Sequence, residues 1–434
     1  MKKIDKNDGI TGRKELRDSL RSMKRADILV GIPSYNNART IGHVVKAVQA
    51  GLAKYFPHMR AVLVNSDGGS TDGTPDVVQK ASIEDFQSIL VRHRAIPVFK
   101  IATPYSGIPG KGSAFRTIFE IAGMLKVKAC AVVDSDLRSI TPEWIELLIK
   151  PLIDDSYDYV APLYHRHKYD GTITNSIVYP LTRALYGKRI RQPIGGDFGF
   201  SGKLAEFYLS KDVWETDVAR FGIDIWMTTT AVANDFRVCQ AFLGAKIHDP
   251  KDPGADLSAM LYEVTGAAFD LMEAYEDVWN KVSGSEDIPS YGFQYAVGLE
   301  PVSVNLERMV DKFRLGVEEL GSIWKEVLSP DIIDFLYDVK KVSVDNFHIP
   351  SEAWAEIVYS FAIGVHRKIM NKEHLLKSLT PLYMGRTASF VIETAGSDSA
   401  EVEAKIDELC QVFEHKKNML IADWVQQGGF HEHS

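Results

Sequence analysis

The sequence has 434 residues, 45% hydrophobic and 25% charged, a composition typical of a globular protein with more than one hydrophobic core. Its net charge of −8 and pI near 5.9 exclude a general nucleic-acid binder, which would carry a basic surface. No apolar run reaches the roughly 18 residues that a membrane-spanning helix needs. The charged stretch 1–18 lacks the apolar core of a secretory signal, and the three cysteines are widely spaced. We therefore expect a cytoplasmic protein with free thiols.

The first half of the chain alternates short apolar strands with amphipathic helices. The predicted elements are a leading helix at 13–24, strands at 27–32, 61–65, 97–102 and 129–133, and helices at 39–54 and 113–125. A polar loop follows every one of these strands. The alternation predicts an α/β fold with a doubly wound, mostly parallel sheet and helices on both faces. The polar loops are then expected together at one edge of that sheet.

The pattern is less regular in the second half. It predicts helices at 141–152, 173–186 and 221–236, strands at 158–163 and 238–247, and long amphipathic helices at 303–328, 350–371 and 401–425. A domain boundary is expected near residue 290. The helix predicted at 303–328 carries an apolar stripe that needs burial. That burial is expected either against the same chain or in a homodimer.

Two carboxylates, Asp134 and Asp136, end the strand predicted at 129–133, with Ser135 between them. In an open α/β sheet, ligands bind beyond the carboxyl ends of the strands. Mg²⁺ and Mn²⁺ take oxygen ligands and commonly bridge a carboxylate to a diphosphate. Alternatively, Asp134 and Ser135 only turn the chain and Asp136 is a solvated cap, since Asp-x-Asp often occurs by chance. The pair is therefore one candidate for a divalent-cation site.

Three further polar positions follow predicted strands. Asp67 opens the glycine-rich loop 67–74 and could accept hydrogen bonds from a base or a ribose, although such sequences also form plain surface turns. In the loop 109–112, Lys111 and the helix start that follows could face an anion, or Lys111 could simply be solvated. His248 could ligate Mn²⁺, although a lone histidine more often packs or lies at the surface.

Seven motifs, in this order and spacing, resemble the retaining GT-A glycosyltransferases that make glucosyl- or mannosyl-3-phosphoglycerate. They are 33–37, 67–74, 109–112, 134–136, 192–197, 222–224 and His248, and the resemblance covers roughly residues 25–255. It implies a GT-A fold with a helical C-terminal extension. The implied domains are an N-terminal helix (1–25), a catalytic domain (26–290) with a nucleotide-sugar half (26–137) and an acceptor half (138–290), and a helical region (291–434).

The resemblance also implies a reaction and residue roles. The reaction is the transfer of a hexose from UDP-glucose or GDP-mannose to glycerate or a phosphoglycerate-like hydroxy acid, with retention by front-face attack. Sugar-donor binding is implied for Pro33, Tyr35, Asp67, Lys111, Ser135, Gly195 and Gly196. Catalytic roles are implied for Asp134, Asp224 and Lys111, Mg²⁺ or Mn²⁺ ligation for Asp136 and His248, and acceptor binding for Thr172, Thr174, Asn175 and Asp197.

Two other functions stay open on the residues alone. A sugar-nucleotide nucleotidyltransferase would carry a basic, glycine-rich loop after the first strand, where this chain has 33–37. A non-catalytic module that binds sugar nucleotides would not need Asp136, Asp224 and His248 together. The donor, the phosphorylation state of the acceptor and the purpose of 291–434 are not specified by the sequence.

The sequence departs from the family where the acceptor is expected. The family has Gly-Arg-Val-Thr-Glu, with the arginine and threonine holding the acceptor phosphate, whereas this chain has Gly-Thr-Ile-Thr-Asn at 171–175. Asp197 and Asp224 stand where the family has glutamates. A carboxylate that is one methylene shorter reaches less far, so the sugar pocket is expected to differ.

We predict from Thr172 that an unphosphorylated acceptor such as D-glycerate is preferred over 3-phosphoglycerate. Replacing an arginine–phosphate pair by a neutral hydroxyl forfeits about 1–2 kcal/mol, or roughly tenfold in affinity. Competition of both acceptors at equal concentration, with each sugar donor, measures the preference. A clear preference for 3-phosphoglycerate would mean that another cation replaces the arginine. The flanking candidates are Lys168, Arg183, Lys188, Arg189 and Arg191.

Overall fold

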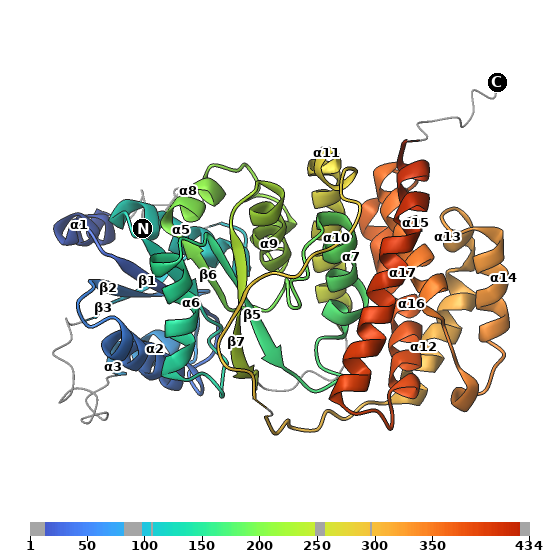
Figure 1. Ribbon diagram of the computed structural model, residues 1–434, viewed down its shortest axis with the longest axis horizontal. Coiled ribbons are helices and arrows are strands. Elements are labelled where there is room, and N and C mark those ends of the chain that lie inside the picture. Colours follow the sequence, from blue (N-terminus) through green and yellow to red (C-terminus); the bar gives the residue numbers. More distant parts are fainter. Residues whose placement is uncertain (1–13, 82–97, 106, 248–256, 296, 426–434) are drawn as a thin grey trace. The chain divides into compact units, whose positions relative to one another are not determined.

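The computed structural model describes residues 14–81, 98–105, 107–247, 257–295 and 297–425 (Figure 1). Its contacts divide the chain into two units. The first comprises Met1–His165, Ile190–Asp249 and Ile288–Glu300, and the second Arg166–Arg189, Pro250–Asp287 and Pro301–Ser434. The division therefore differs from a single boundary near residue 290. Segments 166–189 and 250–287 join the second unit because their helices pack against the C-terminal helices.

The first unit is built on one eight-stranded sheet. The strands are β1 (Ile28–Ser34), β2 (Ala61–Asp67), β3 (Phe99–Pro104), β4 (Ala129–Val132), β5 (Tyr159–His165), β6 (Phe198–Ser201), β7 (Val238–Ala245) and β8 (Ser290–Tyr291). Their order is β3-β2-β1-β4-β6-β5-β7-β8. Of the strands in the described part of the chain, β6 alone runs antiparallel to its neighbours. The α/β class and the mostly parallel sheet are thus confirmed.

Helices of the first unit cover both faces of this sheet (Figure 1). They are α1 (Lys14–Met23), α2 (Ile41–Tyr55), α3 (Thr74–Lys80), α5 (Lys111–Leu125), α6 (Pro142–Asp154), α8 (Gly202–Leu209) and α9 (Ile223–Ala233), with a 3₁₀ turn, η4 (Asp217–Ala219). Helices α2 and α6 pack together on one face, and α5 packs with α8 on the other. Strand β6, with four residues, was not predicted.

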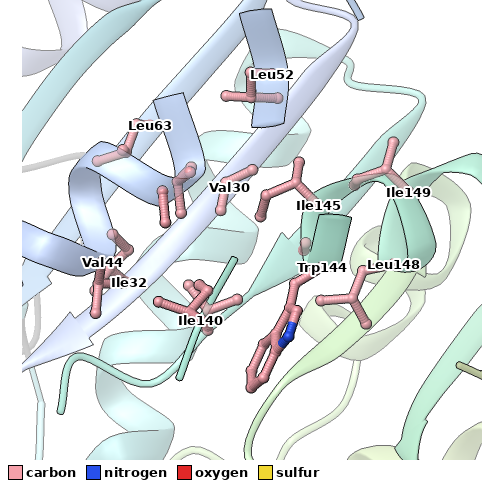
Figure 2. Packing of buried hydrophobic residues seen from close by; sticks show 14 of the residues in the cluster. Val30, Ile32, Val44, Leu52, Leu63, Ile140, Trp144, Ile145, Leu148 and Ile149 are labelled. Atoms are coloured by element: carbon pink, nitrogen blue, oxygen red, sulfur yellow. The ribbon is translucent and has the colours of Figure 1, made fainter. Parts of the chain in front are cut away.

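Strands β1, β2, β4 and β6 are buried on both faces, whereas the edge strands β3 and β8 are mostly half-buried or exposed. Val30 and Ile32 of β1 point into the cluster formed with Val44 and Ile145 (Figure 2). The intervening Gly31 faces the other side, where an added Cβ would lie 2.6 Å from Cδ1 of Ile118. Alternate residues of one strand therefore serve two cores, which fixes the register of β1 between α2 and α5.

The second unit is helical. It contains a π-helical turn, η3 (Thr174–Val178), a 3₁₀ turn, η5 (Val344–Asn346), and α7 (Tyr179–Tyr186), α10 (Ser258–Ala274), α11 (Glu276–Trp279), α12 (Leu306–Glu319), α13 (Gly321–Lys325), α14 (Pro330–Val339), α15 (Ser351–His366), α16 (Lys372–Glu393) and α17 (Ser399–Val425). The predicted helix at 303–328 is two helices, α12 and α13, with Leu320 between them. Helices α10, α14 and α16 were not predicted.

The apolar stripe of α12 is buried within its own chain. Met309, Phe313 and Val317 are all at most 1% exposed. Helix α12 lies against α16, and an added Cβ on Gly316 would come within 2.3 Å of Cβ of Pro381. The stripe is thus accounted for without a second copy, so it no longer argues for the expected homodimer.

Two expectations from composition can be compared with the structure. Cys130, Cys239 and Cys410 are buried thiols that form no disulfide within the described residues, as predicted. Burial raises the pKa of the Cys130 and Cys239 thiols, which makes both poor nucleophiles. Among the helices that the structure describes, none has the length and apolar character needed to cross a membrane.

Candidate active site

The polar residues at one edge of the sheet come from strands of opposite direction. Asp134 follows β4, and Lys246 follows β7. Asp197 directly precedes β6, which is antiparallel to β4. The amino end of β6 therefore lies at the same edge as the carboxyl ends of its neighbours, and this topology brings the three residues together.

The side chain of Lys246 connects these strand ends. Its Nζ donates to Oδ2 of Asp134 (2.7 Å), to Oδ2 of Asp197 (2.8 Å) and to the carbonyl oxygen of Gly195 (2.7 Å). The hydroxyl of Tyr164 donates to Asp197, and Oδ1 of Asp197 accepts from the backbone N–H of Asp134 at 2.8 Å. Lys246 is 4% exposed and Asp197 is fully buried. This arrangement fixes the side chain and the backbone of Asp134.

A second lysine extends the cluster toward the helices. Lys111, the first residue of α5, places its Nζ 2.9 Å from Oδ1 of Asp134 and 3.2 Å from Oδ1 of Asp224, near the start of α9. Asp134 thus pairs with one lysine on each of its two oxygens. The cluster holds three carboxylates against two ammonium groups, which leaves one formal negative charge.

The surroundings of these three carboxyl groups shift their pKa values in different directions. Burial acts to raise the pKa of Asp134, but the ammonium groups of Lys111 and Lys246 outweigh it and hold the pKa well below its ordinary value. Burial dominates at Asp197 and Asp224 and raises the pKa of both. Burial acts to lower the pKa of Lys111, but Asp134 and Asp224 outweigh it and raise the pKa. The most persistent negative charge therefore lies on Asp134.

The turn 195–196 requires glycine for reasons within the protein. Gly196 has φ +89°, and a Cβ there would come within 2.2 Å of Oδ2 of Asp134. A Cβ on Gly195 would come within 2.2 Å of Cγ of Pro162. The two glycines therefore allow the turn to pass beside Asp134 and Lys246, whereas their contact with a sugar stays a prediction.

The loop 109–112 is shaped by a neighbouring backbone segment. A Cβ on Gly112 would come within 2.0 Å of the carbonyl oxygen of Val218, and the backbone N–H of Gly112 donates to the carbonyl oxygen of Arg220 at 3.2 Å. This amide is therefore used inside the protein. From this loop, Lys111 supplies the cation that the sequence predicted.

The expected sugar-donor residues at β1 and β2 lie side by side. Asp67 accepts from the hydroxyls of Ser34 (3.0 Å) and Ser70 (2.6 Å) and from the N–H groups of Gly69 (2.9 Å) and Ser70 (2.8 Å), so it orders its own loop. Pro33 is buried in β1, whereas Tyr35 is 63% exposed beside the loop. A base could stack on this exposed ring.

The loop after β4 is tied to the loop after β1. The Ser135 hydroxyl donates to Oδ1 of Asn37 at 2.8 Å, and its carbonyl oxygen accepts from the Thr40 hydroxyl at 2.8 Å. Ser135 is buried, so its contribution within the protein is to position the backbone between Asp134 and Asp136.

Asp136 fits the role of a cation ligand. It is half-buried and, among the described residues, its carboxylate has neither a hydrogen-bond nor an ion-pair partner. Its position contrasts with that of Asp134, both of whose oxygens are engaged. His248 lies outside the described residues. In the part of the chain that the structure covers, no three His, Cys, Asp or Glu side chains are grouped as a metal site.

Three of the expected acceptor residues, Thr172, Thr174 and Asn175, lie in the second unit, whereas Asp197 lies in the first. The hydroxyl of Thr172 shares a hydrogen bond with that of Tyr383 on α16. Asp197 is occupied by Lys246 and Tyr164, so its contact with an acceptor stays a prediction.

The cations proposed as substitutes for an arginine at 172 are mostly engaged elsewhere. Lys168 donates to the carbonyl oxygens of Ala395 (3.2 Å) and Ser397 (3.1 Å). The remaining pairs are Arg183 with Glu414, Lys188 with Glu286, and Arg189 with Asp287.

Sequence reasoning missed Lys246 and Tyr164. Both lie at the end of strands whose other residues are apolar, and a buried lysine in such a place needs a carboxylate partner. That requirement was the available signal for Lys246. The partners themselves could not be named, because they lie on other strands.

Comparisons with known proteins indicate the enzyme class. Residues 29–213 match the family model described as glycosyl transferase family 2. A glucosyl-3-phosphoglycerate synthase from Petrotoga mobilis is 24% identical over 276 residues, which cover 59% of this chain and 76% of that protein. The chain is therefore a glycosyltransferase, and the enzyme class expected from the sequence is confirmed.

Two solved structures of glucosyl-3-phosphoglycerate synthase from Mycobacterium tuberculosis are similar at lower identity. The complex with Mg²⁺ and UDP is 18% identical, with a TM-score of 0.41, and the match covers 60% of this chain and 83% of that chain. The complex with Mn²⁺, UDP-glucose and phosphoglyceric acid is 19% identical, with a TM-score of 0.40 and the same coverage. In this glycosyltransferase the matched family domain contains Lys111 and Asp134 but ends before Asp224 and Lys246.

We predict that Lys246→Met destabilises the glycosyltransferase strongly. The substitution leaves the fully buried carboxylate of Asp197 without its cation, and breaking a buried ion pair in this way costs about 3–5 kcal/mol. Tyr164→Phe removes only one hydrogen bond and should cost about 1 kcal/mol. Urea denaturation followed by tryptophan fluorescence gives both values.

The matched control is Lys54→Met. Lys54 pairs with Glu143 at 3.1 Å, but both side chains are well exposed, so the loss should be about 1 kcal/mol or less. If Lys246→Met were no more destabilising than Lys54→Met, the cluster would not have the structural role assigned to it.

Proposed function

We propose that the chain is a metal-dependent, retaining glycosyltransferase that moves a hexose from a nucleotide diphosphate sugar to a small hydroxy acid. The observation that carries the proposal is the position of Asp136. This carboxylate, which has no partner among the described residues, follows β4 directly beside the Lys111–Asp134–Asp224 cluster, at the sheet edge where α/β folds bind ligands. The name of the Petrotoga mobilis relative supports glucose as the hexose and 3-phosphoglycerate or a similar acid as the acceptor.

Different residues of the first unit bind different parts of the sugar donor. Tyr35 offers an exposed ring to the base, and the ordered loop at Asp67 borders it. Lys111 stabilises negative charge on the leaving diphosphate, because its ammonium group stays protonated between Asp134 and Asp224. Asp224 accepts hydrogen bonds from the transferred sugar, as the resemblance implies.

Asp136 and His248 would hold the Mg²⁺ or Mn²⁺ ion. The ion would act as a Lewis acid and neutralise negative charge on the diphosphate. Asp134 keeps its ion pairs with Lys111 and Lys246. Its role is to fix the position of the backbone that continues into Ser135 and Asp136. No carboxylate is assigned as a covalent nucleophile, which is consistent with front-face attack guided by the leaving phosphate.

The proposed reaction can be tested directly. The full chain is incubated with UDP-glucose or GDP-mannose, each with D-glycerate or 3-phosphoglycerate, in Mn²⁺, Mg²⁺ or EDTA, and the products are identified by mass spectrometry. A hexosyl hydroxy acid formed with UDP-glucose and abolished by EDTA is expected. Formation of a sugar nucleotide and pyrophosphate would instead identify a nucleotidyltransferase, and absence of any turnover would leave only a binding module.

We predict that Asp136→Asn abolishes metal-dependent binding of the sugar donor without unfolding the protein. The amide oxygen carries no negative charge and binds a divalent cation far more weakly than a carboxylate, and the side chain supports no contact among the described residues. His248→Ala should have the same effect. Calorimetric titration of UDP-glucose with and without Mn²⁺ measures the loss.

Asp154→Asn, an exposed carboxylate at the end of α6, is the matched control and should bind as the wild type does. Unchanged sugar-donor affinity and turnover in both Asp136→Asn and His248→Ala would overturn the metal assignment.

A further inference from the structure

The chain segments that follow β4 and β7 are joined by two hydrogen bonds beside the candidate active site. The backbone N–H of Arg138 donates to the carbonyl oxygen of Ile247 at 2.9 Å. In the opposite direction, the backbone N–H of Ile247 donates to the hydroxyl oxygen of Ser139, also at 2.9 Å. Both polar groups of the Ile247 backbone are therefore held by one short turn after β4.

The sheet does not provide this connection, because strands β6 and β5 lie between β4 and β7 in its strand order. Beyond the strand ends, Nζ of Lys246 donates to Oδ2 of Asp134 at 2.7 Å. The next residue, Ile247, is held at the other end of the stretch 134–139. This stretch is thus attached to the segment after β7 at both of its ends, and Asp136 lies between the two attachments.

The turn after β4 is itself anchored in the core of the first unit. Leu137 and Ile140 are buried and belong to the hydrophobic cluster that contains residues of β1, α2 and α6. The carbonyl oxygen of Ser135, on the same turn, accepts from the Thr40 hydroxyl at 2.8 Å. The turn is therefore a fixed support, and whatever it binds is held in place relative to Asp136.

Ser139 supplies the side-chain part of this support. It is half-buried, and alanine at this position would leave the Ile247 N–H without this acceptor. His248, a proposed metal ligand, is joined to Ile247 by one peptide bond, so fixing both backbone groups of Ile247 limits where the next residue can lie. Residues that orient metal ligands without touching the ion typically change metal affinity by roughly 10- to 100-fold when they are replaced.

We propose that Ser139 is a positioning residue for the divalent-cation site. Its hydroxyl fixes the backbone of Ile247 and thereby sets the placement of one proposed metal ligand, His248, relative to the other, Asp136. This role rests on the proposed function, in which these two residues hold the ion. It deepens that function by assigning a part in metal binding to a residue that acts through the backbone and is not itself a ligand.

A purely structural role for Ser139 makes a different prediction. If its hydroxyl only stabilises the fold, removing it lowers the free energy of unfolding and leaves the Mn²⁺ affinity of the folded protein unchanged. If it positions a metal ligand, the Mn²⁺ affinity falls in a protein that is still folded. Metal affinity, measured where the protein is folded, therefore separates the two roles.

The test compares Ser139→Ala and Ser139→Thr with the wild type in the full chain. Threonine keeps the hydroxyl, whereas alanine removes it. The matched control is Ser329→Ala in the second unit, where the hydroxyl of a half-buried serine also accepts from a backbone N–H, that of Ile332 at 3.3 Å. Urea denaturation shows that each variant is folded under the conditions of the test.

Two measurements are made on each variant. Mn²⁺ is titrated into the protein with and without UDP, and the free ion is measured by electron paramagnetic resonance against a sample of UDP without protein. Deuterium uptake of the peptide that contains Ile247 is followed by mass spectrometry, because the N–H that Ser139 accepts from exchanges faster once it loses its acceptor.

Ser139→Ala should weaken Mn²⁺ binding roughly tenfold and speed deuterium uptake in the Ile247 peptide. Ser139→Thr and Ser329→Ala should bind Mn²⁺ as the wild type does. In sugar transfer from UDP-glucose, the Mn²⁺ concentration that gives half the maximal rate should rise in Ser139→Ala, whereas the rate at saturating Mn²⁺ should change little, since no group that acts on the substrate is removed.

The outcomes distinguish this proposal from the proposed function. Unchanged Mn²⁺ affinity in Ser139→Ala, with affinity lost in Asp136→Asn, would overturn the positioning role alone. Equal weakening in Ser139→Thr and Ser139→Ala would also overturn it, because the hydroxyl would not be the cause. Mn²⁺ binding that depends on Ser139 in a protein without sugar transfer would support the positioning role and overturn the proposed function. A wild type that binds no Mn²⁺ with UDP would overturn both.

Discussion

The first unit depends on the burial of one ammonium group, that of Lys246. Removing a charge from water costs several kcal/mol, and only well-placed partners offset that cost. Here the partners are the carboxylates of Asp134 and Asp197 and the carbonyl oxygen of Gly195, which come from the ends of two other strands. A shift of β6 by one residue would separate Asp197 from Lys246 and leave a fully buried carboxylate without its cation. The pairing of Lys246 therefore constrains both the register of the sheet and the geometry of the site.

This constraint also orders the candidate metal ligand. Asp134 is held through both oxygens by lysines, and Ser135 is held by Asn37 and Thr40. The backbone is thus fixed on the residues immediately before Asp136, which needs no side-chain contact of its own. A ligand placed by its neighbours stays free for a cation, and such preorganisation is what a binding site requires. The same pairing lowers the pKa of Asp134, whereas burial raises the pKa of Asp224.

The sequence predicted the parts of the fold that depend on local pattern. Strands β1, β2 and β4 are uninterrupted apolar runs followed by polar loops, so their existence and their common edge could be deduced. Strand β6 could not be, because its four residues include Gly199, where a Cβ would come within 2.1 Å of the carbonyl oxygen of Leu148. Gly199 is required by its close contact with helix α6, and no pattern in the neighbouring sequence indicates such a contact. The interrupted helix α12–α13 was missed for a similar reason, since the apolar period continues across Leu320.

The same limit applies to the site. Asp134, Lys111 and Asp224 were selected separately from their motifs, and the structure places them in one cluster. Lys246 was not selected, because its partners lie on other strands and its own surroundings in the sequence are apolar.

The second unit shows that the absence of a motif residue is also hard to interpret from the sequence alone. Comparison position by position finds no arginine at 172, and from this alone one infers a neutral pocket. The residues around Thr172 nevertheless include Arg386 of α16 and Lys405 of α17, each paired with a glutamate. A recognition site is a property of the surface that surrounds the ligand, and any element that reaches this surface can provide the charge. The loss of a motif residue therefore predicts a loss of chemistry only when no other element lines the same pocket. In this chain, helices beyond the matched family domain line it.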